Sequence, residues 1–172
     1  GWLRLRKQQQ GLTGGITVKS GARLKADNST NNGDYDYCLG DESQAVVLTV
    51  EDGGTLDLAE SNVELAGYGP ASIKLQGAGV GGTLGALYLS NTSQQDAFKD
   101  ELDFVADATI NTPSDYRIDI NGRIYTTGDS DITITKIGTG KIQPVWDLST
   151  ASIDEIVIED GNIECEGGTC DN

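Results

Sequence analysis

The sequence predicts an all-β protein, a right-handed parallel β-helix, and three observations lead to this prediction. Short runs of β-forming residues are separated by Gly, Asp and Asn at intervals of about 8 to 12 residues. Glycine is abundant, with 23 among 172 residues, roughly twice its usual share of about 7%. A short pattern around one glycine also recurs along the chain. The same turn spacing suits a β-sandwich or jelly roll, but a solenoid reuses one corner in every coil, so the repeat favours the β-helix.

The recurring pattern consists of β-forming residues, two polar residues, a glycine and a return to alternation. It occurs at residues 16–26 (ITVKSGARLKA), 48–58 (LTVEDGGTLDL) and 156–166 (IVIEDGNIECE). The glycines of the three units are Gly21, Gly53 and Gly161. Glycine adopts the positive φ that a tight corner requires, and alternating flanks are typical of half-buried strands. Each unit is therefore predicted to be a strand, a corner and a second strand.

Further short strands are expected between these units. They fall at residues 71–76, 84–90, 101–110, 116–120, 123–127 and 131–135. Only one segment suggests a helix, residues 94–102 (QQDAFKDEL), where Ser93 is a candidate N-cap. The aromatic content is 6%, which suits narrow coils that stack small aliphatic side chains. The chain is thus predicted to be built almost entirely of strands.

Charge is distributed unevenly along the chain. The net charge is −15, yet the first 25 residues contain six basic residues and no acidic residue. We therefore expect residues 1–12 to form a flexible basic arm, followed by a single β-solenoid domain at residues 13–172. The acidic remainder repels phosphate groups, which argues against nucleic acid and anionic membranes as partners. No window approaches about 18 consecutive apolar residues, so membrane insertion is not expected.

The cysteine content is odd, with three residues. Cys165 and Cys170, in the sequence CEGGTC, are expected to close a small disulfide. Cys38 is then left free or bonded to another chain, for which Cys165 or Cys170 of a neighbouring copy are candidates. A disulfide and two N-glycosylation sequons, at residues 28–30 and 91–93, are compatible with a secreted protein. We therefore expect an extracellular or cell-surface location.

Four stretches in the second half of the chain follow one another in an order typical of a known repeat. They are GGTLGALYLS, DFVADATIN, ITITKIGTGKIQPVW and DEIVIEDGNIE, within residues 81–166. The motifs at residues 106–110, 134–142 and 158–163 resemble the autotransporter-associated β-strand repeat of bacterial passenger domains. The chain departs from that pattern at residues 144–146 (PVW) and in its cysteines. The resemblance implies a parallel β-helix displayed outside the cell as a stalk or adhesive surface.

The stretch ITITKIGTGKIQPV at residues 132–145 contains GTGK, which looks like the end of a phosphate-binding loop. Such a loop requires a glycine where this chain has Thr135 and a hydroxyl where it has Ile142. The residues that follow do not have a helical pattern, so no helix N-terminus would face a phosphate. We predict a strand, a glycine corner and a second strand, with Lys136 and Lys141 facing solvent.

Composition also limits the chemistry that is open to the chain. It has no histidine, which excludes Ser–His–Asp and Cys–His catalysis and histidine-containing zinc sites. Polysaccharide-cleaving β-helices use carboxylate groups. The candidate pairs are Asp34 with Asp36, Asp52 with Asp57, and Asp129 with Asp131. With 27 acidic residues such pairs arise by chance, so we predict no enzymatic activity and no cofactor other than calcium.

The acidic segment at residues 27–43 (DNSTNNGDYDYCLGDES) offers two alternatives to an exposed polar loop. Its carboxylates are candidate calcium ligands, because calcium prefers oxygen donors. The residues in question are Asp34, Asp36 and Asp41. Its tyrosines suit a sugar- or protein-binding surface, so a carbohydrate-binding or polysaccharide-cleaving domain is the alternative function. The candidate stacking residues are Tyr35, Tyr37, Tyr88, Tyr125 and Trp146.

The leading hypothesis is a non-enzymatic extracellular β-helix with a structural or adhesive role. Strands at the ends of a solenoid expose unpaired backbone groups, and the two ends of this chain carry opposite charge. We expect head-to-tail assembly into a filament or surface appendage, because a contact that does not close on itself propagates. The residues assigned to this contact are Arg4, Arg6, Lys7, Cys38, Glu159 and Asp160. The expected partners are other copies of the chain, together with host or matrix glycans or proteins.

Overall fold

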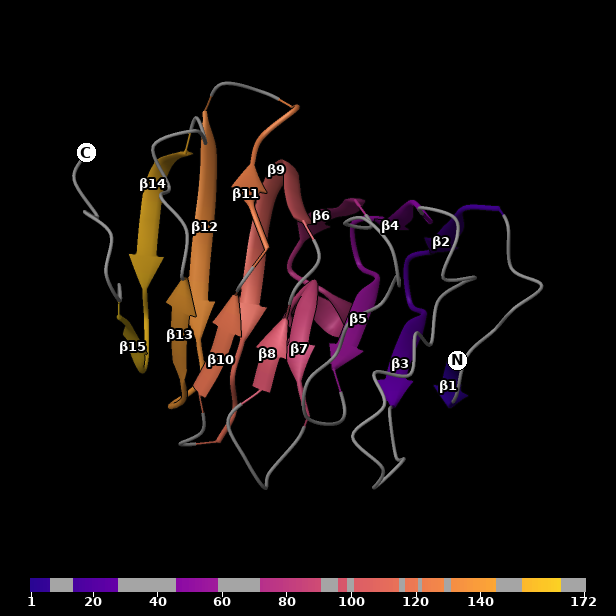
Figure 1. The fold of residues 1–172 in the computed structure, drawn as a ribbon, viewed down its shortest axis with the longest axis horizontal. Coiled ribbons are helices and arrows are strands. Elements are labelled where there is room, and N and C mark those ends of the chain that lie inside the picture. The colour runs from indigo at the N-terminus through magenta and orange to yellow at the C-terminus, as the bar shows by residue number, and fades with distance from the viewer. Residues whose placement is uncertain are drawn as a thin grey trace.

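The computed structural model describes ten segments of the chain. They are residues 1–6, 14–27, 46–58, 72–90, 96–98, 101–114, 117–120, 122–128, 131–144 and 153–164. These segments form short strands and one 3₁₀ turn, η1 (Val80–Gly82). The strands lie side by side along the long axis of the molecule, from β1 at one end to β14 and β15 at the other (Figure 1). Every strand pairing among the described residues is parallel, which confirms the predicted β-solenoid and not the sandwich.

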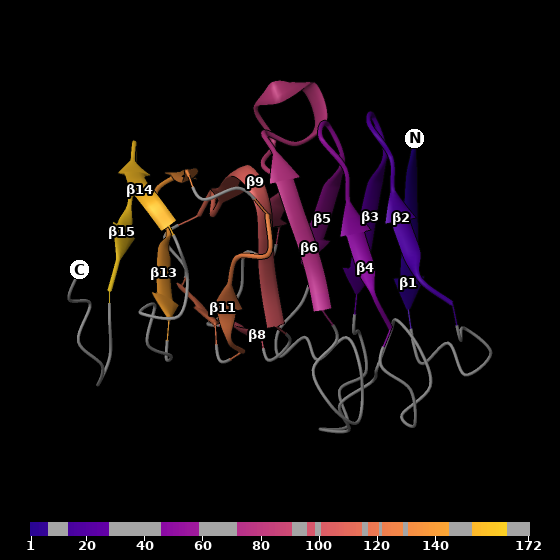
Figure 2. The ribbon, with the colours of Figure 1, turned by 90° about the horizontal axis from the view of Figure 1, so that it is seen from above.

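The strands form three stacks, which are the faces of the solenoid. Stack A contains β2 (Ile16–Val18), β4 (Leu48–Val50), β6 (Ser72–Gly77), the first part of β9 (Glu101–Asn111) and β11 (Ile124–Tyr125). Stack B contains β1 (Trp2–Arg6), β3 (Arg23–Asp27), β5 (Thr55–Leu58), β7 (Leu87–Leu89), the last part of β9, β12 (Ile132–Ile137) and β14 (Ile153–Ile158). Stack C contains β8 (Asp96–Phe98), β10 (Arg117–Ile120), β13 (Lys141–Pro144) and β15 (Asn162–Ile163). In Figure 2, β2, β4 and β6 of stack A lie in front of β1, β3 and β5 of stack B.

Strand β9 belongs to two stacks because it turns a corner while staying extended. Leu102 pairs with β6 and β11 in stack A. Ile110 pairs with β7 and β12 in stack B. Between them the exposed Asp107 marks the outside of the bend. This strand therefore joins the two faces without the glycine corner used elsewhere.

The core consists of aliphatic rows that run across the strands. The inner row of stack B contains Leu3, Leu24, Leu56, Leu87, Ile110, Lys136 and Ile158. A matching row in stack A contains Ile16, Leu48, Ile73, Leu102 and Ile124. Most of these side chains are buried, and Phe104 is the largest fully buried residue among those described. Each fully buried aliphatic side chain stabilises the fold by about 1.5–3 kcal/mol, so the stacked rows hold successive coils together.

The three repeat units form the corners that the sequence predicts. Gly21, Gly53 and Gly161 have φ values of 74°, 77° and 75°, a region that other residues rarely adopt. The first two units also stack in register, because β2 pairs with β4 and β3 with β5. Gly138, within the GTGK stretch, has φ 80° and separates β12 from β13. That stretch is therefore a strand, a corner and a strand, as predicted.

Two predictions about local structure are wrong. Residues 94–102 do not form a helix: Asp96–Phe98 is strand β8, and β9 begins at Glu101. Pairing of β8 with β10 in stack C outweighs the weak helical pattern. Residues 1–12 are not wholly a flexible arm either, because Trp2–Arg6 is strand β1 and pairs with β3. The alternating sequence WLRLR places its leucines in line with the inner row, and residues 7–12 lie outside the described part of the chain.

Candidate functional site

The outer face of stack B at its N-terminal end concentrates basic and aromatic side chains. The residues that alternate with the inward Leu3 and Leu24 point outward, and four of them line an open hollow of about 230 Å³. They are Trp2, Arg4, Arg23 and Lys25. Trp2 is the most exposed large apolar residue described, at 69%. We call this feature the basic hollow.

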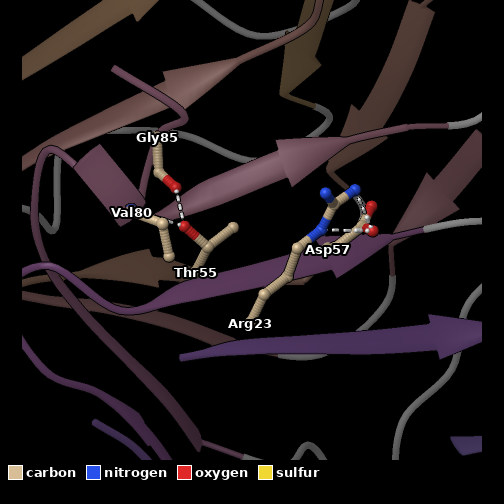
Figure 3. Close-up of polar contacts among 5 residues, drawn as sticks. All are labelled: Arg23, Thr55, Asp57, Val80 and Gly85. Atoms are coloured by element: carbon tan, nitrogen blue, oxygen red, sulfur yellow. Dashed lines mark hydrogen bonds and ion pairs between the residues drawn. The ribbon is translucent and has the colours of Figure 1, made fainter. Parts of the chain in front are cut away.

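A partly buried ion pair supports one wall of the basic hollow (Figure 3). Asp57 on β5 is fully buried although it points outward. Its Oδ2 accepts hydrogen bonds from Nε of Arg23 at 2.9 Å and from Nη2 at 2.6 Å. The guanidinium of Arg23 also lies 5.0 Å from the centre of the Tyr88 ring, within cation–π range. Arg23 is therefore held in place by Asp57 on one side and Tyr88 on the other.

Thr55, two residues before Asp57, fixes the neighbouring corner (Figure 3). Its hydroxyl donates to the carbonyl oxygen of Gly85 at 2.8 Å and accepts from the backbone N–H of Val80 at 2.9 Å. Thr55 is completely buried. One side chain thus satisfies two backbone groups of the loop that contains η1, and this loop is the glycine-rich segment between β6 and β7.

The opposite end of stack B is acidic and partly apolar. Ile156 and Ile158 on β14 are 41% and 49% exposed. Exposed carboxylates surround them, at Asp154, Glu155, Glu159 and Asp160. At the other end of the same stack, Leu3 is 58% exposed. The outermost described strands of stack B therefore carry exposed apolar side chains, with bases at one end and acids at the other.

Lys136 is buried, contrary to the prediction that it faces solvent. It occupies the inner row of stack B between Ile110 and Ile158. Its ammonium group donates to the carbonyl oxygens of Ile137 at 2.8 Å, Gly138 at 2.5 Å and Asp160 at 3.1 Å. Burial lowers the pKa of Lys136 from 10.5 to about 8, and the negative charge of Asp160 opposes this shift. The side chain thus bridges two corners from inside the core.

Lys141, the second lysine of the GTGK stretch, lies on the outer side of stack C. It is 42% exposed and donates to Oε1 of Glu164 at 2.6 Å. This hydrogen bond is the main reason that the pKa of Glu164 is lowered. The pair joins β13 to the residue after β15, so Lys141 has a structural partner and is not placed to hold a phosphate.

The predicted aromatic residues that are described do not form one row. Tyr88 lies on stack B beside Arg23. Tyr125 lies on stack A, where its hydroxyl is 2.9 Å from Oγ of Ser72 and Arg123 stacks on its ring. The carboxylates Asp52 and Asp57 differ as well, because Asp52 is exposed at a corner while Asp57 is buried against Arg23. The two members of this candidate carboxylate pair therefore lie in different environments.

Several predicted site residues lie outside the described part of the chain. They are Lys7, Asp34, Tyr35, Asp36, Tyr37, Cys38, Asp41, Asp129, Trp146, Cys165 and Cys170. Arg4 and Arg6 lie on β1, and Glu159 and Asp160 lie at the corner after β14. Within the described segments, no three Cys, Asp or Glu side chains are grouped as metal ligands would be. The same segments contain no helix with the length and hydropathy of a membrane span.

Comparison with known proteins identifies no relative. No protein-family model, curated protein or solved structure matches the chain.

Proposed function

We propose that this chain is a non-enzymatic structural β-solenoid of the cell exterior that assembles end to end with copies of itself. The observation that carries the proposal is the complementarity between β1 and β14. Both are the outermost described strands of stack B, and each pairs with a described strand on one side only. An open parallel edge accepts a further strand, and these two edges belong to the same face of the solenoid.

Continuing the parallel pairing from one copy to the next defines a register. The inner row of stack B ends at Ile158 and begins at Leu3, so these two residues become neighbours. Both are about half exposed in the single chain, at 49% and 58%. Burying them extends the aliphatic row across the junction and removes apolar surface from water. The hydrophobic effect therefore favours this contact.

The same register pairs opposite charges on the outer face. One position beyond Ile158 and Leu3, Glu159 lies opposite Arg4. Lys25 lies opposite Arg4 on the neighbouring strand β3 of the same copy, and it adds a second positive charge nearby. Charge complementarity of this kind steers association and disfavours wrong registers. Since the two surfaces differ, the contact is heterologous and propagates into a filament.

A location outside the cell and an adhesive role rest on the resemblance to the autotransporter-associated repeat. A solenoid suits such a role because adding coils lengthens it without changing its faces.

A charge exchange tests the assembly. Sedimentation velocity and electron microscopy at low salt should show linear assemblies of the unmodified chain. Arg4→Glu and Glu159→Arg should each leave monomers, because like charges then face each other. The double variant should assemble again, since the pair is restored in reverse. Lys19→Glu, at an exposed corner lysine, is the matched control and should not block assembly. Monomers of the unmodified chain at low salt would contradict the proposal.

Cross-linking tests the register. In a background with Cys38, Cys165 and Cys170 changed to serine, Leu3→Cys and Ile158→Cys should form an intermolecular disulfide on mild oxidation. Neighbouring strands lie about 4.8 Å apart, which is within the Cα separation that a disulfide spans. Leu3→Cys with Ile156→Cys is two residues out of register and should cross-link much less. Equal cross-linking of both pairs would show association without this register.

A further inference from the structure

The corner between β14 and β15 contains the dipeptide Asp160–Gly161, in which a backbone nitrogen lies beside a carboxyl group. The N–H of Gly161 donates to Oδ1 of Asp160 at 2.9 Å. The side chain of Asp160 is exposed, so water reaches it. Reacting atoms held about 3–3.5 Å apart are close to an attack geometry. The nitrogen of Gly161 is therefore near the carboxyl carbon of Asp160, and a bond between the two would close a five-membered ring.

Glycine at residue 161 leaves this nitrogen unhindered. Gly161 has φ 75°, a conformation that other residues rarely adopt. A Cβ at this position would collide with the backbone carbonyl oxygens of Gly138 and Gly140. The packing that excludes a side chain at residue 161 thus also keeps the nitrogen open to the carboxyl group of Asp160.

Lys136 contacts the backbone carbonyl group that the ring would contain. Its ammonium group donates to the backbone oxygen of Asp160 at 3.1 Å. A positive charge at this oxygen withdraws electrons from the peptide bond to Gly161, which makes the N–H of Gly161 more acidic. The same charge stabilises the negative charge that develops on the oxygen when water adds to its carbon. Lys136 is thus placed to favour both closure of the ring and its opening at this carbonyl.

We propose that Asp160–Gly161 is a site of spontaneous isoaspartate formation and that Lys136 directs the reaction. In the first step the nitrogen of Gly161 bonds to the carboxyl carbon of Asp160, and the carboxyl hydroxyl leaves with the amide hydrogen as water. In the second step a water molecule adds to the backbone carbonyl carbon of Asp160, and the bond from this carbon to the nitrogen breaks. The chain then runs through the side-chain carbon, and the former backbone carbonyl becomes a carboxylate. Since this carboxylate forms beside the ammonium group of Lys136, the ion pair favours isoaspartate over the return to aspartate.

Asp52–Gly53 provides a matched comparison within the same chain. Both corners have the sequence Glu-Asp-Gly, and Gly53 has φ 77°. The carboxylate of Asp52, however, is directed at the next coil, where it occupies the space that a Cβ on Gly77 would need. Lys19 in the preceding coil donates to the side chain of Glu51 and not to a backbone carbonyl. The two sites thus share their local sequence and differ in the two contacts on which the proposal depends.

Peptide mapping with electron-transfer fragmentation, which distinguishes isoaspartate from aspartate at each position, tests the proposal. The chain carries Arg4→Glu at the opposite end, so the result does not depend on whether the unmodified chain assembles. During prolonged incubation at neutral pH, isoaspartate should form at residue 160 about tenfold faster than at residue 52. In urea the two sites should react at similar rates, because their local sequences match.

Two lysine variants separate the effect of Lys136 from that of the corner. Lys136→Met should lower the rate at residue 160, relative to residue 52, by about tenfold. Lys141→Met is the matched control and should leave this ratio unchanged. Residue 52 also reports on the fold, because a loosened chain would react faster there. Equal rates at the two sites in the folded chain, or an unchanged ratio in Lys136→Met, would overturn the proposal.

Discussion

The ammonium nitrogen of Lys136 lies 3.1 Å from the backbone carbonyl oxygen of Asp160, which belongs to the next coil of the solenoid. The lysine reaches this oxygen from an inner row that is otherwise aliphatic. Two more carbonyl oxygens, of Ile137 and Gly138, complete its hydrogen bonds. A buried charge is tolerated here because all three donors of the ammonium group have partners.

The lowered pKa of Lys136 predicts that the free energy of unfolding changes with pH in the alkaline range. The folded pKa is about 8, below the ordinary value of 10.5, so the unfolded chain binds the proton more tightly between these values. The free energy of unfolding should therefore rise as pH increases from about 8 to 10.5, by on the order of 2–3 kcal/mol in total. Urea denaturation at several pH values, with reducing agent present, measures this slope.

Two substitutions separate Lys136 from the other titrating groups. Lys136→Met should remove most of the rise, because the titrating group is gone and an apolar side chain suits the inner row. Lys141→Met replaces a half-exposed lysine that is paired with Glu164. This variant should show the same rise in the free energy of unfolding with pH as the unmodified chain. A slope that survives in Lys136→Met would show that another group causes the pH dependence.

The surroundings of Gly161 and Gly21 predict that substitution by alanine destabilises the protein by different amounts at the two positions. Both have positive φ, 75° and 74°, so alanine is strained at either position by about 1–2 kcal/mol. At Gly21 an added Cβ meets no atom within 4 Å, whereas at Gly161 it would collide with backbone carbonyl oxygens and approach Nζ of Lys136 at 2.8 Å. Gly161→Ala should therefore lower the free energy of unfolding by about 2 kcal/mol more than Gly21→Ala. If thermal or chemical denaturation shows equal losses of stability for the two variants, the backbone around Gly161 is not as close as described.

The Arg23–Asp57 pair predicts a non-additive mutant cycle. Asp57→Ala should cost about 2–3 kcal/mol, because it leaves the guanidinium without its buried partner. The double variant Arg23→Met with Asp57→Ala should be destabilised by less than the sum of the two single variants, since neither charge then remains to be compensated. The exposed Lys19–Glu51 pair is the control, and Lys19→Met should cost less than about 1 kcal/mol. Additive effects in the Arg23 and Asp57 cycle would mean that the two side chains do not stabilise each other.

The hydrogen bonds of Thr55 predict a loss of stability when only its hydroxyl group is removed. Thr55→Val keeps the shape of the side chain but leaves the carbonyl of Gly85 and the N–H of Val80 without this partner. We expect Thr55→Val to lower the free energy of unfolding by about 1–3 kcal/mol. Thr49→Val, at a partly exposed outward position on β4, should change stability by less than about 0.5 kcal/mol. Similar results for the two variants would argue against a structural role for the Thr55 hydroxyl.

The corners and most of the strands could be predicted from the sequence. The glycine-centred units predict corners at Gly21, Gly53 and Gly161, and all three have positive φ. Period-2 alternation predicts most of the strands that are described. The same alternation was present in WLRLR at residues 2–6 and in ITITKI at residues 132–137. Their positive charges led to the wrong expectation of an arm and of a solvent-facing Lys136, although the period placed both segments in the sheet.

The sequence by itself determined the strand period and the corners, because alternation and glycine act within a few residues. It also determined the opposite charges of the two ends, which need no folding to be seen. Only the tertiary structure decided that Asp57 is buried under Arg23, that Lys136 reaches Asp160, and that Trp2 joins the basic hollow. Each of these contacts links residues more than twenty positions apart. Their partners are set by which strands stack, and stacking depends on the burial of whole rows and not on any local pattern.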